Sequence, residues 1–274
     1  MEATILSIAG SDPTGGAGLQ ADLKTLGVLG VYGAGVVTCI TVQNSHGVKR
    51  VEPLAPDLVE QQIEAVLDDH HVTHIKTGMI GTGAIARAAG RALKTFSGEV
   101  VVDPVLLSTT GQELYNRSDI DTLKEEISGR ATVLTPNLPE LSTLVDKKVT
   151  DAEEALEAAG LLLEEFPNLR AVLVKGGHLE GGPEVSDLLL HRSAGSIRLV
   201  SSTRPLVTTR NTHGTGCVLA TAFAAFHSLT GEYEQAFYRA AGFIQRALEW
   251  SRPLRIVRNP EGRGGLLLSP RTET

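Results

Sequence analysis

The chain has 274 residues, of which 42% are hydrophobic and 21% are charged, and its net charge is −7. This composition can build a full apolar core without disulfide or metal cross-links, so it excludes a disordered chain. The acidic balance argues against a nucleic-acid-binding protein, because contact with a phosphate backbone needs clustered basic residues.

Short apolar runs alternate with amphipathic stretches along the whole sequence. Several runs are continuously Val-, Ile- and Leu-rich, which is typical of strands buried on both faces of a parallel sheet. The predicted strands are 4–9, 35–41, 74–79, 100–105, 132–135 and 171–175. The predicted helices are 17–29, 57–69, 84–95, 118–127, 139–145, 151–166, 215–228 and 233–250, with Asp57 and Asp151 as N-caps.

The stretch after residue 185 has a different pattern. Two strand-like runs, 188–192 and 197–200, flank the turn sequence at 193–196, which predicts a hairpin and antiparallel edge strands. The whole pattern predicts an α/β fold. We expect one domain over 1–250, with 251–274 as an irregular C-terminal segment of the same domain.

Location is predicted from what the sequence lacks. It has no run of about 18 apolar residues, so no membrane span is expected. The N-terminal residues have no basic region before an apolar run, so no signal peptide is expected. Two cysteines, Cys39 and Cys217, are too few for a disulfide framework or a four-thiolate zinc site. These observations predict a cytoplasmic protein.

The strongest local motif is NTHGTGC at residues 211–217, directly before a helix of small residues. Its glycines allow the backbone to approach a ligand, and the helix start offers unpaired amides, so Gly214, Thr215 and Gly216 form a candidate phosphate site. Cys217 would lie in the first helical turn, where the pKa of a thiol is lowered. A buried helix with a buried cysteine is an equally good interpretation of this motif alone.

A second glycine-rich loop, residues 10–18, follows the first predicted strand. It is not a Walker A loop, because no Lys-Ser or Lys-Thr follows its glycines. Its place at the carboxyl end of a strand is where open α/β sheets bind ligands. Asp22 follows one helical turn later and could reach a hydroxyl group, although a solvated helix charge is the simpler interpretation.

Polar residues also follow four other predicted strands. Gln43 carries an amide that donates and accepts, which matches the edge of an aminopyrimidine. Asn137 and Glu140, three residues apart, could hold Mg²⁺ or could simply cap a helix. Asp103 and Lys175 each end a strand. Since the carboxyl ends of parallel strands share one edge of the sheet, we expect these residues and Gly10 to converge.

A competing motif lies at residues 81–86, GTGAIA, which matches the dinucleotide fingerprint G-x-G-x-x-A. Asp103 follows about 20 residues later, where a ribose-binding acid is expected. This alternative predicts an NAD-binding oxidoreductase. It leaves the loops at Gly10, Asn137, Lys175 and Gly214 without a function.

Taken together, these motifs resemble the bifunctional hydroxymethylpyrimidine/phosphomethylpyrimidine kinases of thiamine biosynthesis, in the ribokinase superfamily. The resemblance covers about residues 3–250 and rests on segments 8–12, 15–25, 42–44, 76–79, 103–105, 135–140, 175–178 and 211–217. It implies a ribokinase-like three-layer fold with a mainly parallel central sheet. It also implies an ATP- and Mg²⁺-dependent kinase that phosphorylates an alcohol and then the resulting monophosphate.

The resemblance also implies roles for individual residues. Gln43 and Asp22 would contact the pyrimidine substrate in a pocket lined by Gly10, Ala17, Met79 and Val105. The anion hole would be Gly214, Thr215 and Gly216, with Cys217 at the place of a catalytic base. Asn137 and Lys175 would lie at the ATP, and Glu140 and Asp103 at Mg²⁺.

The resemblance further implies a homodimer. The acidic charge and the lack of a long apolar run predict that it binds neither nucleic acid nor membrane. Pyridoxal or pyridoxine kinase is a close alternative, because relatives share the motif at 214–217. A non-catalytic nucleotide-binding regulator is a third alternative, and the joint presence of Cys217, Asn137, Glu140 and Lys175 argues against it.

Overall fold

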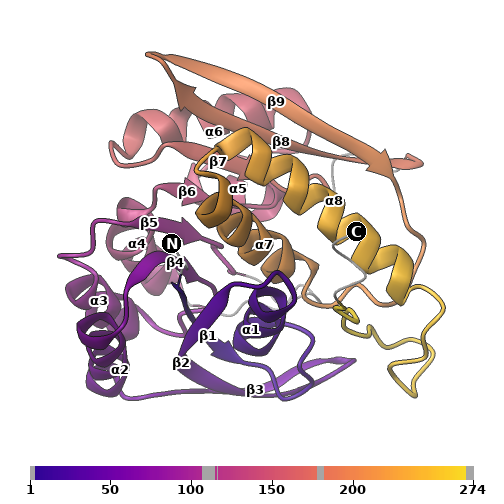
Figure 1. The fold of residues 1–274 in the computed structure, drawn as a ribbon, viewed down its shortest axis with the longest axis horizontal. Helices are drawn as coiled ribbons and strands as arrows, with labels where there is room; N and C mark the ends of the chain where they lie inside the picture. Colours follow the sequence, from indigo (N-terminus) through magenta and orange to yellow (C-terminus); the bar gives the residue numbers. More distant parts are fainter. Residues whose placement is uncertain (1–3, 107–114, 116, 178–181, 270–274) are drawn as a thin grey trace.

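A nine-stranded sheet forms the centre of the computed structural model, which describes residues 4–106, 115, 117–177 and 182–269 (Figure 1). The strand order is β3-β2-β1-β4-β5-β6-β7-β8-β9. The strands are β1 Thr4–Ser11, β2 Tyr32–Asn44, β3 Gly47–Pro53, β4 Val72–Thr77, β5 Glu99–Val102, β6 Val133–Leu134, β7 Ala171–Val174, β8 Glu184–Ser193 and β9 Ser196–Pro205.

The inner strands are parallel and the outer ones are not. Strands β2, β1, β4, β5, β6 and β7 pair in parallel, whereas β3, β8 and β9 pair antiparallel to their neighbours. The chain moves outward from β1 in both directions, first to β2 and later to β4. The carboxyl ends of β1 and β4 therefore flank the point where ligands bind in open α/β sheets.

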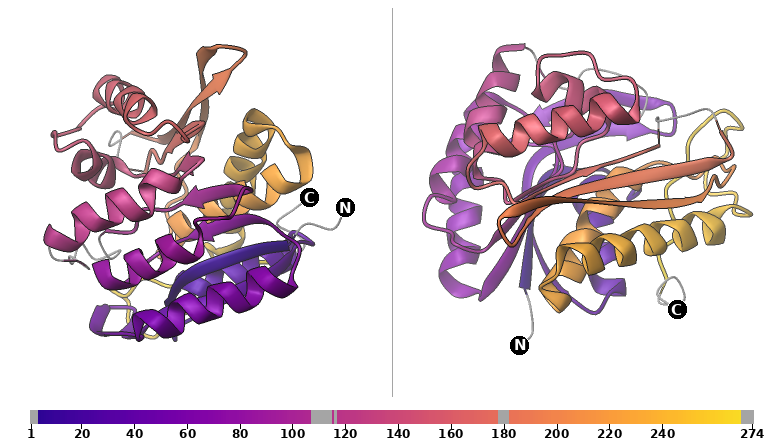
Figure 2. Two further views of the ribbon diagram at one scale, coloured as in Figure 1. Left: turned by 90° about the vertical axis from the view of Figure 1, so that its left-hand side faces the viewer. Right: turned by 90° about the horizontal axis from the view of Figure 1, so that it is seen from above.

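Helices cover both faces of this sheet (Figure 2). One apolar cluster packs α2–α6 against one face, and a second packs α1, α7 and α8 against the other. The helices are α1 Gly18–Val28, α2 Pro56–Asp69, α3 Gly83–Ala92, α4 Arg117–Glu126, α5 Leu138–Leu144, α6 Ala152–Glu165, α7 Thr215–Thr230 and α8 Tyr233–Ser251, with a 3₁₀ turn at Ser128–Arg130. The predicted three-layer α/β fold with antiparallel edge strands is confirmed.

One local prediction is wrong, and one strand was not predicted. Asp57 is not an N-cap, because α2 begins one residue earlier at Pro56, whose fixed φ suits a first helical position. Strand β3 was not predicted, because its Lys, Arg and Glu side chains suit an exposed edge rather than a buried run. Asp151 does cap α6, since its side chain accepts a hydrogen bond from the amide of Glu154.

Residues 252–269 follow α8 without forming a further helix, and they pack against the loop around His213. The amide of His213 donates to the carbonyl of Gly264 at 3.0 Å. Within the part of the chain that the structure describes, we find no helix long and apolar enough to cross a membrane.

Candidate active site

A cavity of about 650 Å³ opens at the carboxyl edge of the parallel strands. Loops after β1, β2, β4, β5, β6 and β7 and the start of α7 contribute to its wall. The residues predicted for the site that line it are Gly10, Ala17, Gln43, Met79, Asp103, Val105, Asn137, Glu140, Lys175, Gly214, Thr215, Gly216 and Cys217. The residues predicted to converge at one edge of the sheet thus do so, whereas Asp22, which the resemblance places at the substrate, is not among the lining residues.

The start of α7 has the geometry of an anion site. Gly214 precedes the helix with a φ of 82°, and no side chain within the described residues caps the helix. The next residues, Thr215 to Cys217, line the cavity. The amide of Thr215 also donates to the carbonyl of Thr212, at 3.4 Å. First-turn amides have no acceptor within their own helix and lie at the positive end of its dipole, so this turn can receive a negatively charged phosphoryl group.

This turn is held by contacts between backbones. A Cβ atom added at Gly214 would lie 1.9 Å from the carbonyl oxygen of Gly16, and one at Gly265 would lie 2.7 Å from the Cα of Gly16. No side chain fits between these segments. The three glycines therefore let the loop after β1, the turn before α7 and the C-terminal segment approach one another closely.

A buried carboxylate joins two of these segments. Asp12, which is 1% exposed, accepts hydrogen bonds at Oδ2 from Nε2 of His213 at 2.8 Å and from the amide of Ala17 at 2.9 Å. Burial by itself would raise the pKa of Asp12. The hydrogen bonds from His213 and Thr14 together have the larger, opposite effect, so this pKa lies below its ordinary value and the carboxylate stays charged. Both residues lie inside motifs that the sequence analysis identified, yet it assigned neither a function.

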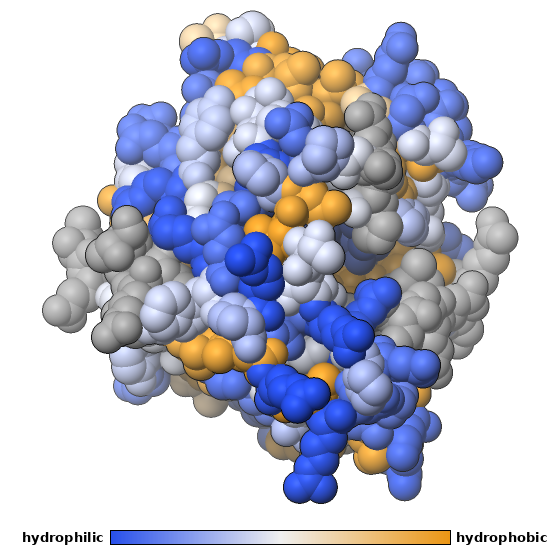
Figure 3. Space-filling view, turned by 90° about the vertical axis from the view of Figure 1, so that its right-hand side faces the viewer, coloured by the Kyte–Doolittle hydropathy of each residue, from blue (hydrophilic) through white to orange (hydrophobic). Residues whose placement is uncertain are grey.

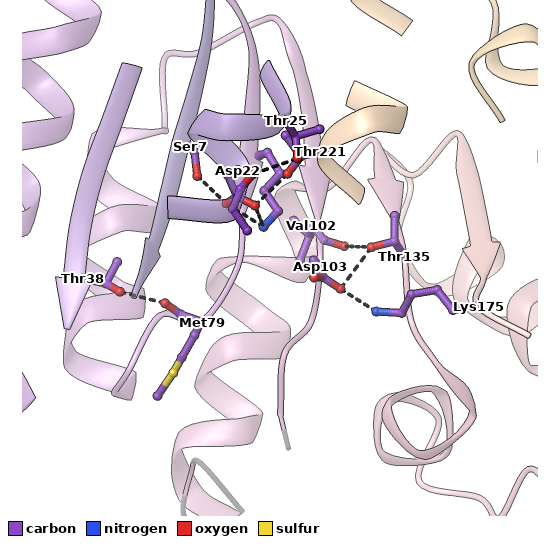
Figure 4. A network of polar contacts seen from close by, with 12 residues as sticks. Ser7, Asp22, Thr25, Thr38, Met79, Val102, Asp103, Thr135, Lys175 and Thr221 are labelled. Atoms are coloured by element: carbon purple, nitrogen blue, oxygen red, sulfur yellow. Dashed lines mark hydrogen bonds and ion pairs between the residues drawn. The ribbon is translucent and has the colours of Figure 1, made fainter. Parts of the chain in front are cut away.

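Asp22 corrects a prediction. Its side chain is fully buried and lies beneath the cavity, paired with the buried Lys76 at 2.8 Å. Its remaining acceptor sites are taken by the hydroxyls of Ser7 and Thr221 (Figure 4). Asp22 therefore holds α1, β1, β4 and α7 together and is not part of the cavity wall. Burial lowers the pKa of Lys76, but the nearby Asp22 carboxylate raises it above its ordinary value.

A second ion cluster does line the cavity. Lys175 contacts Asp103 at 2.6 Å and Glu140 at 3.2 Å (Figure 4 shows the first pair). Burial raises the pKa of Glu140 to about 7, with Lys175 opposing this shift and Asp103 adding to it. Asn137 and Glu140 also form a capping box, in which each side chain accepts from the amide of the other. The helix-capping interpretation of this pair is therefore correct.

Cys217 also differs from expectation. The helix start was expected to lower the pKa of its thiol, but burial raises this pKa to about 12. Lys76 opposes the shift, and Asp103 and Asp22 add to it. The desolvation of the thiolate outweighs the helix dipole here. Cys217 is thus a neutral thiol at pH 7.

The competing motif at 81–86 forms an ordinary internal turn. The amides of Ile80 and Gly81 donate to the hydroxyl of Tyr115 at 2.7 and 2.9 Å, and the amide of Gly83 donates to Asp119. The side chain of Thr82 caps α3, because it accepts a hydrogen bond from the amide of Ile85. The amides that a dinucleotide would need already have protein partners, so the NAD-binding interpretation is wrong.

Two segments next to predicted site residues fall outside the described residues. One contains His178, the last residue of the motif that begins at Lys175, and the other begins at residue 107, directly after Leu106.

Comparison with known proteins gives consistent results. The family described as phosphomethylpyrimidine kinase matches residues 12–260. A hydroxymethylpyrimidine/phosphomethylpyrimidine kinase from Rhizobium meliloti is 39% identical over 96% of this chain and 96% of its own length. A thiamine biosynthesis bifunctional protein from Geobacter sulfurreducens is 38% identical over 92% of this chain, which spans half of that longer protein.

Solved structures agree with these sequence matches. A pyridoxal kinase from Staphylococcus aureus, in complex with AMP-PCP and pyridoxal, superposes with a TM-score of 0.79 at 30% identity, covering 91% of this chain and 89% of that one. A phosphomethylpyrimidine kinase from Clostridium difficile 630 superposes with a TM-score of 0.77 at 32% identity, covering 90% and 99%. The chain thus has a ribokinase-like kinase fold, and it belongs to the phosphomethylpyrimidine kinase family.

Proposed function

We propose that this kinase uses ATP to phosphorylate the hydroxymethyl group of 4-amino-5-hydroxymethyl-2-methylpyrimidine and then phosphorylates the monophosphate to the diphosphate for thiamine biosynthesis. The names of the relatives support this substrate. The observation that carries the proposal is that one cavity is lined by an amide side chain, a helix-start anion site and an ion cluster. These are Gln43, the turn 214–217 and Lys175 with its carboxylates.

At the substrate end, Gln43 would bind the pyrimidine. Its amide can donate to a ring nitrogen and accept from the amino group, the pattern that an aminopyrimidine edge presents. Gly10, Ala17, Met79 and Val105 line the same cavity and offer small or apolar contacts to the ring. A Cβ atom at Gly10 would lie 2.7 Å from Sγ of Cys39, so this part of the wall is closely packed.

At the nucleotide end, Lys175 and Asn137 would bind ATP. Lys175 keeps its charge, because Asp103 and Glu140 raise its pKa although burial lowers it. As a fixed cation it would stabilise the phosphate chain. Asn137 lies beside it at the start of α5, in the same cavity wall.

The residues also fit Mg²⁺. Asp103 is 1% exposed, and its Oδ2 atom has no hydrogen-bond partner among the described residues although it is buried. Carboxylate oxygen is the ligand that Mg²⁺ prefers, together with phosphate oxygens and water. Asp103, with Glu140 nearby, would hold the ion, which supplies charge neutralisation on the phosphates. Among the described residues, no group of three or more His, Cys, Asp or Glu side chains could hold a metal ion.

In the first step, the hydroxymethyl oxygen would bond to the γ-phosphorus while the bond from that phosphorus to the bridging oxygen of ADP breaks, and the hydroxyl proton would pass to an oxygen of the transferred phosphoryl group. The amides of Gly214, Thr215 and Gly216 would stabilise the charge on the transferred group. Cys217 would orient the hydroxyl as a neutral thiol, since a thiol with a pKa of about 12 holds its proton at pH 7. In the second step the acceptor phosphate is already ionised, because its second pKa is about 6.

A coupled ADP-release assay tests the proposal, with the alcohol, its monophosphate and pyridoxal as separate acceptors. We expect turnover with both pyrimidines, at a higher kcat/KM than with pyridoxal. Faster turnover of pyridoxal would favour the second candidate, which the structural similarity to pyridoxal kinases supports. No turnover of either pyrimidine would contradict the proposal.

We also propose that the protein is a homodimer, as the resemblance implies, and that it is located in the cytoplasm, as the sequence predicts. Light scattering would give a mass of about twice the 29.0 kDa of one chain. A mass of one chain at micromolar concentration would contradict it.

A further inference from the structure

The loop that carries Lys175 is held by the neighbouring edge strands of the sheet. Strand β7 ends at Val174, and the amide of Lys175 donates to the carbonyl of Pro136 at 2.9 Å. A Cβ atom at the next residue, Gly176, would overlap the carbonyl oxygen of Ser186 on β8. The loop after β7 therefore runs directly against the backbone of β8, where only glycine fits.

A buried carboxylate fastens this loop to β8. Asp187, which is 2% exposed, accepts a hydrogen bond at Oδ1 from the amide of Gly176 at 2.7 Å. Its other oxygen, Oδ2, lies 2.6 Å from Nη2 of Arg204. Arg204 lies on β9 opposite Val185 of β8, so it is a diagonal neighbour of Asp187. A chain of contacts thus leads from β9 through Asp187 to the residue after Lys175.

These residues form one end of the cavity wall. Asp187 and Arg204 line the cavity together with Lys175. Figure 3 shows the side of the molecule toward which the parallel strands run, where apolar patches lie among strongly hydrophilic side chains. An apolar wall beside a lysine suits a nucleotide, which has a flat base and charged phosphates. The apolar residues at this end include Pro205, Leu206, Val207, Ile244 and Leu248.

The position of the Lys175 ammonium group depends on this loop. Its Nζ atom lies 2.6 Å from Asp103 and 3.2 Å from Glu140 (Figure 4 shows the first pair). The stem of lysine is flexible, so the place of its charge is set by these carboxylates and by the backbone from which the stem starts. A displaced loop would move the charge away from a bound phosphate, and Coulomb attraction falls with distance.

Arg204 compensates the charge that Asp187 brings to the cavity wall. A lone carboxylate at this end would repel the phosphates of a nucleotide. The side chain of Arg204 is only 13% exposed, so its attraction to Asp187 is screened less by water than that of a surface pair. Asp187 can therefore accept from the amide of Gly176 without presenting an unpaired negative charge to the nucleotide.

We propose that Asp187 is a positioning residue for ATP, which acts through Lys175 by fixing the amide of Gly176, and that Arg204 neutralises it. This inference rests on the proposed binding of ATP by Lys175. It extends the nucleotide end of the site to β8 and β9, the antiparallel strands at the edge of the sheet.

The test is the Kd for the ATP analogue AMP-PCP with Mg²⁺, measured by calorimetry on the full chain. For Asp187→Ala we expect Kd to rise by about 10-fold, because the loop loses its acceptor. Asp187→Asn keeps an oxygen that can accept from Gly176 and should recover most of this rise. Arg204→Gln leaves the carboxylate unpaired and should raise Kd by about 10-fold as well. Circular dichroism reports whether each variant is folded.

A double-mutant cycle separates positioning from a general structural role. If Asp187 acts through Lys175, Asp187→Ala should change Kd by less than about twofold in the Lys175→Met background, because the group that it positions is gone. A rise of about 10-fold in both backgrounds would overturn the inference. An unchanged Kd in Asp187→Ala, or an equal rise in Asp187→Asn, would also overturn it.

Glu99→Ala is the matched control. Glu99 also pairs with an arginine, Arg170 at 2.8 Å, but it begins β5 at the amino edge of the sheet, opposite the cavity. Its loss should leave Kd within about twofold of the wild-type value, and a rise equal to that of Asp187→Ala would count against positioning by Asp187. Failure of the proposed function is a different result, in which the wild-type chain turns over neither pyrimidine whatever its Kd for AMP-PCP.

Discussion

Two glycine-containing turns in this molecule lead from a loop into a helix, and only one of them opens to a ligand. At the start of α7, Gly214 places an uncapped helix end against the cavity. At the start of α3, the amides of Ile80, Gly81 and Gly83 donate to Tyr115 and Asp119 instead. Similar sequence motifs therefore form either a binding site or an internal support.

The difference arises from what surrounds each turn. A hydroxyl and a carboxylate 34 to 36 residues away in the chain satisfy the α3 turn. The α7 turn instead packs through Gly214 against the backbone of Gly16, which in turn contacts Gly265, and Thr215 to Cys217 line the cavity. A glycine motif thus gives backbone freedom, and its neighbours decide whether the amides stay available.

The largest expected effect comes from replacing the glycine of the α7 turn by alanine, compared with the same change in the α3 turn. Gly214→Ala would place a methyl group 1.9 Å from a carbonyl oxygen, and we expect kcat/KM to fall by about 100-fold or more, because the anion site must shift. Gly81→Ala is the matched control, since it also has a positive φ but its Cβ would meet nothing closer than 3.5 Å. It should lower the free energy of unfolding by about 1–2 kcal/mol with kcat/KM within threefold.

Steady-state kinetics and denaturant unfolding of both variants give the comparison. Equal losses of activity at the two turns would mean that the α3 turn also contacts substrate.

The carboxylates of Asp12, at the α7 turn, and Asp119, at the α3 turn, allow a second comparison of the two turns. Asp12→Asn replaces an oxygen that accepts from both His213 and Ala17, so we expect kcat/KM to fall by about 10-fold as the α7 turn loosens. Asp119→Asn should leave kcat/KM unchanged within threefold and lower the free energy of unfolding by about 1 kcal/mol. The same assays measure both variants, and a wild-type kcat/KM for Asp12→Asn would contradict the supporting role.

The internal turn should depend on Tyr115 for stability alone. Tyr115→Phe leaves two buried amides without their acceptor, so the free energy of unfolding should fall by about 1–3 kcal/mol. Urea unfolding measures this change. A wild-type value of unfolding free energy, or a loss of kcat/KM beyond threefold, would refute the assignment of this turn to internal support.

A third helix start, at α5, gives the smallest effect and depends on pH. Its capping box contains Glu140, whose raised pKa of about 7 means that the folded chain binds a proton more tightly than the unfolded one. The free energy of unfolding should therefore fall by about 1–3 kcal/mol as the pH rises from about 4.5 to 7, and it should stay level above pH 7. The Glu140→Gln variant, which cannot titrate at this position, should lack this fall. Urea unfolding at pH 5 and 8 checks it, and parallel pH profiles would exclude this role.

The sequence predicted the elements that have strong periodicity and the edge where the site lies. It placed Gln43, Asp103 and Lys175 at one cavity because strand ends in a parallel sheet share an edge. It misjudged Asp22, because the lysine that buries and neutralises this carboxylate is 54 residues away in the chain. Pairs between distant segments leave no local pattern, and this also explains why Asp12 was assigned no function.

The expected thiolate of Cys217 failed for a related reason. A helix start was visible in the sequence, whereas the burial of the thiol, which outweighs the helix dipole, depends on the packing of several segments. The place of the C-terminal segment was not predicted either, because the residues after 251 carry no motif. Hydrogen bonds from Arg263 and Gly264 to Ser45 and Arg210 hold this segment beside the cavity.

The contact of Gly16, Gly214 and Gly265 has a consequence for folding. These residues are separated by about 200 and 50 positions, so bringing them together carries the entropy cost of closing long loops. Contacts between such distant segments tend to form late, after the local helices and hairpins. A chain with nearly complete secondary structure would then still lack its phosphate-binding turn, and the appearance of catalytic turnover would mark the last stage of refolding.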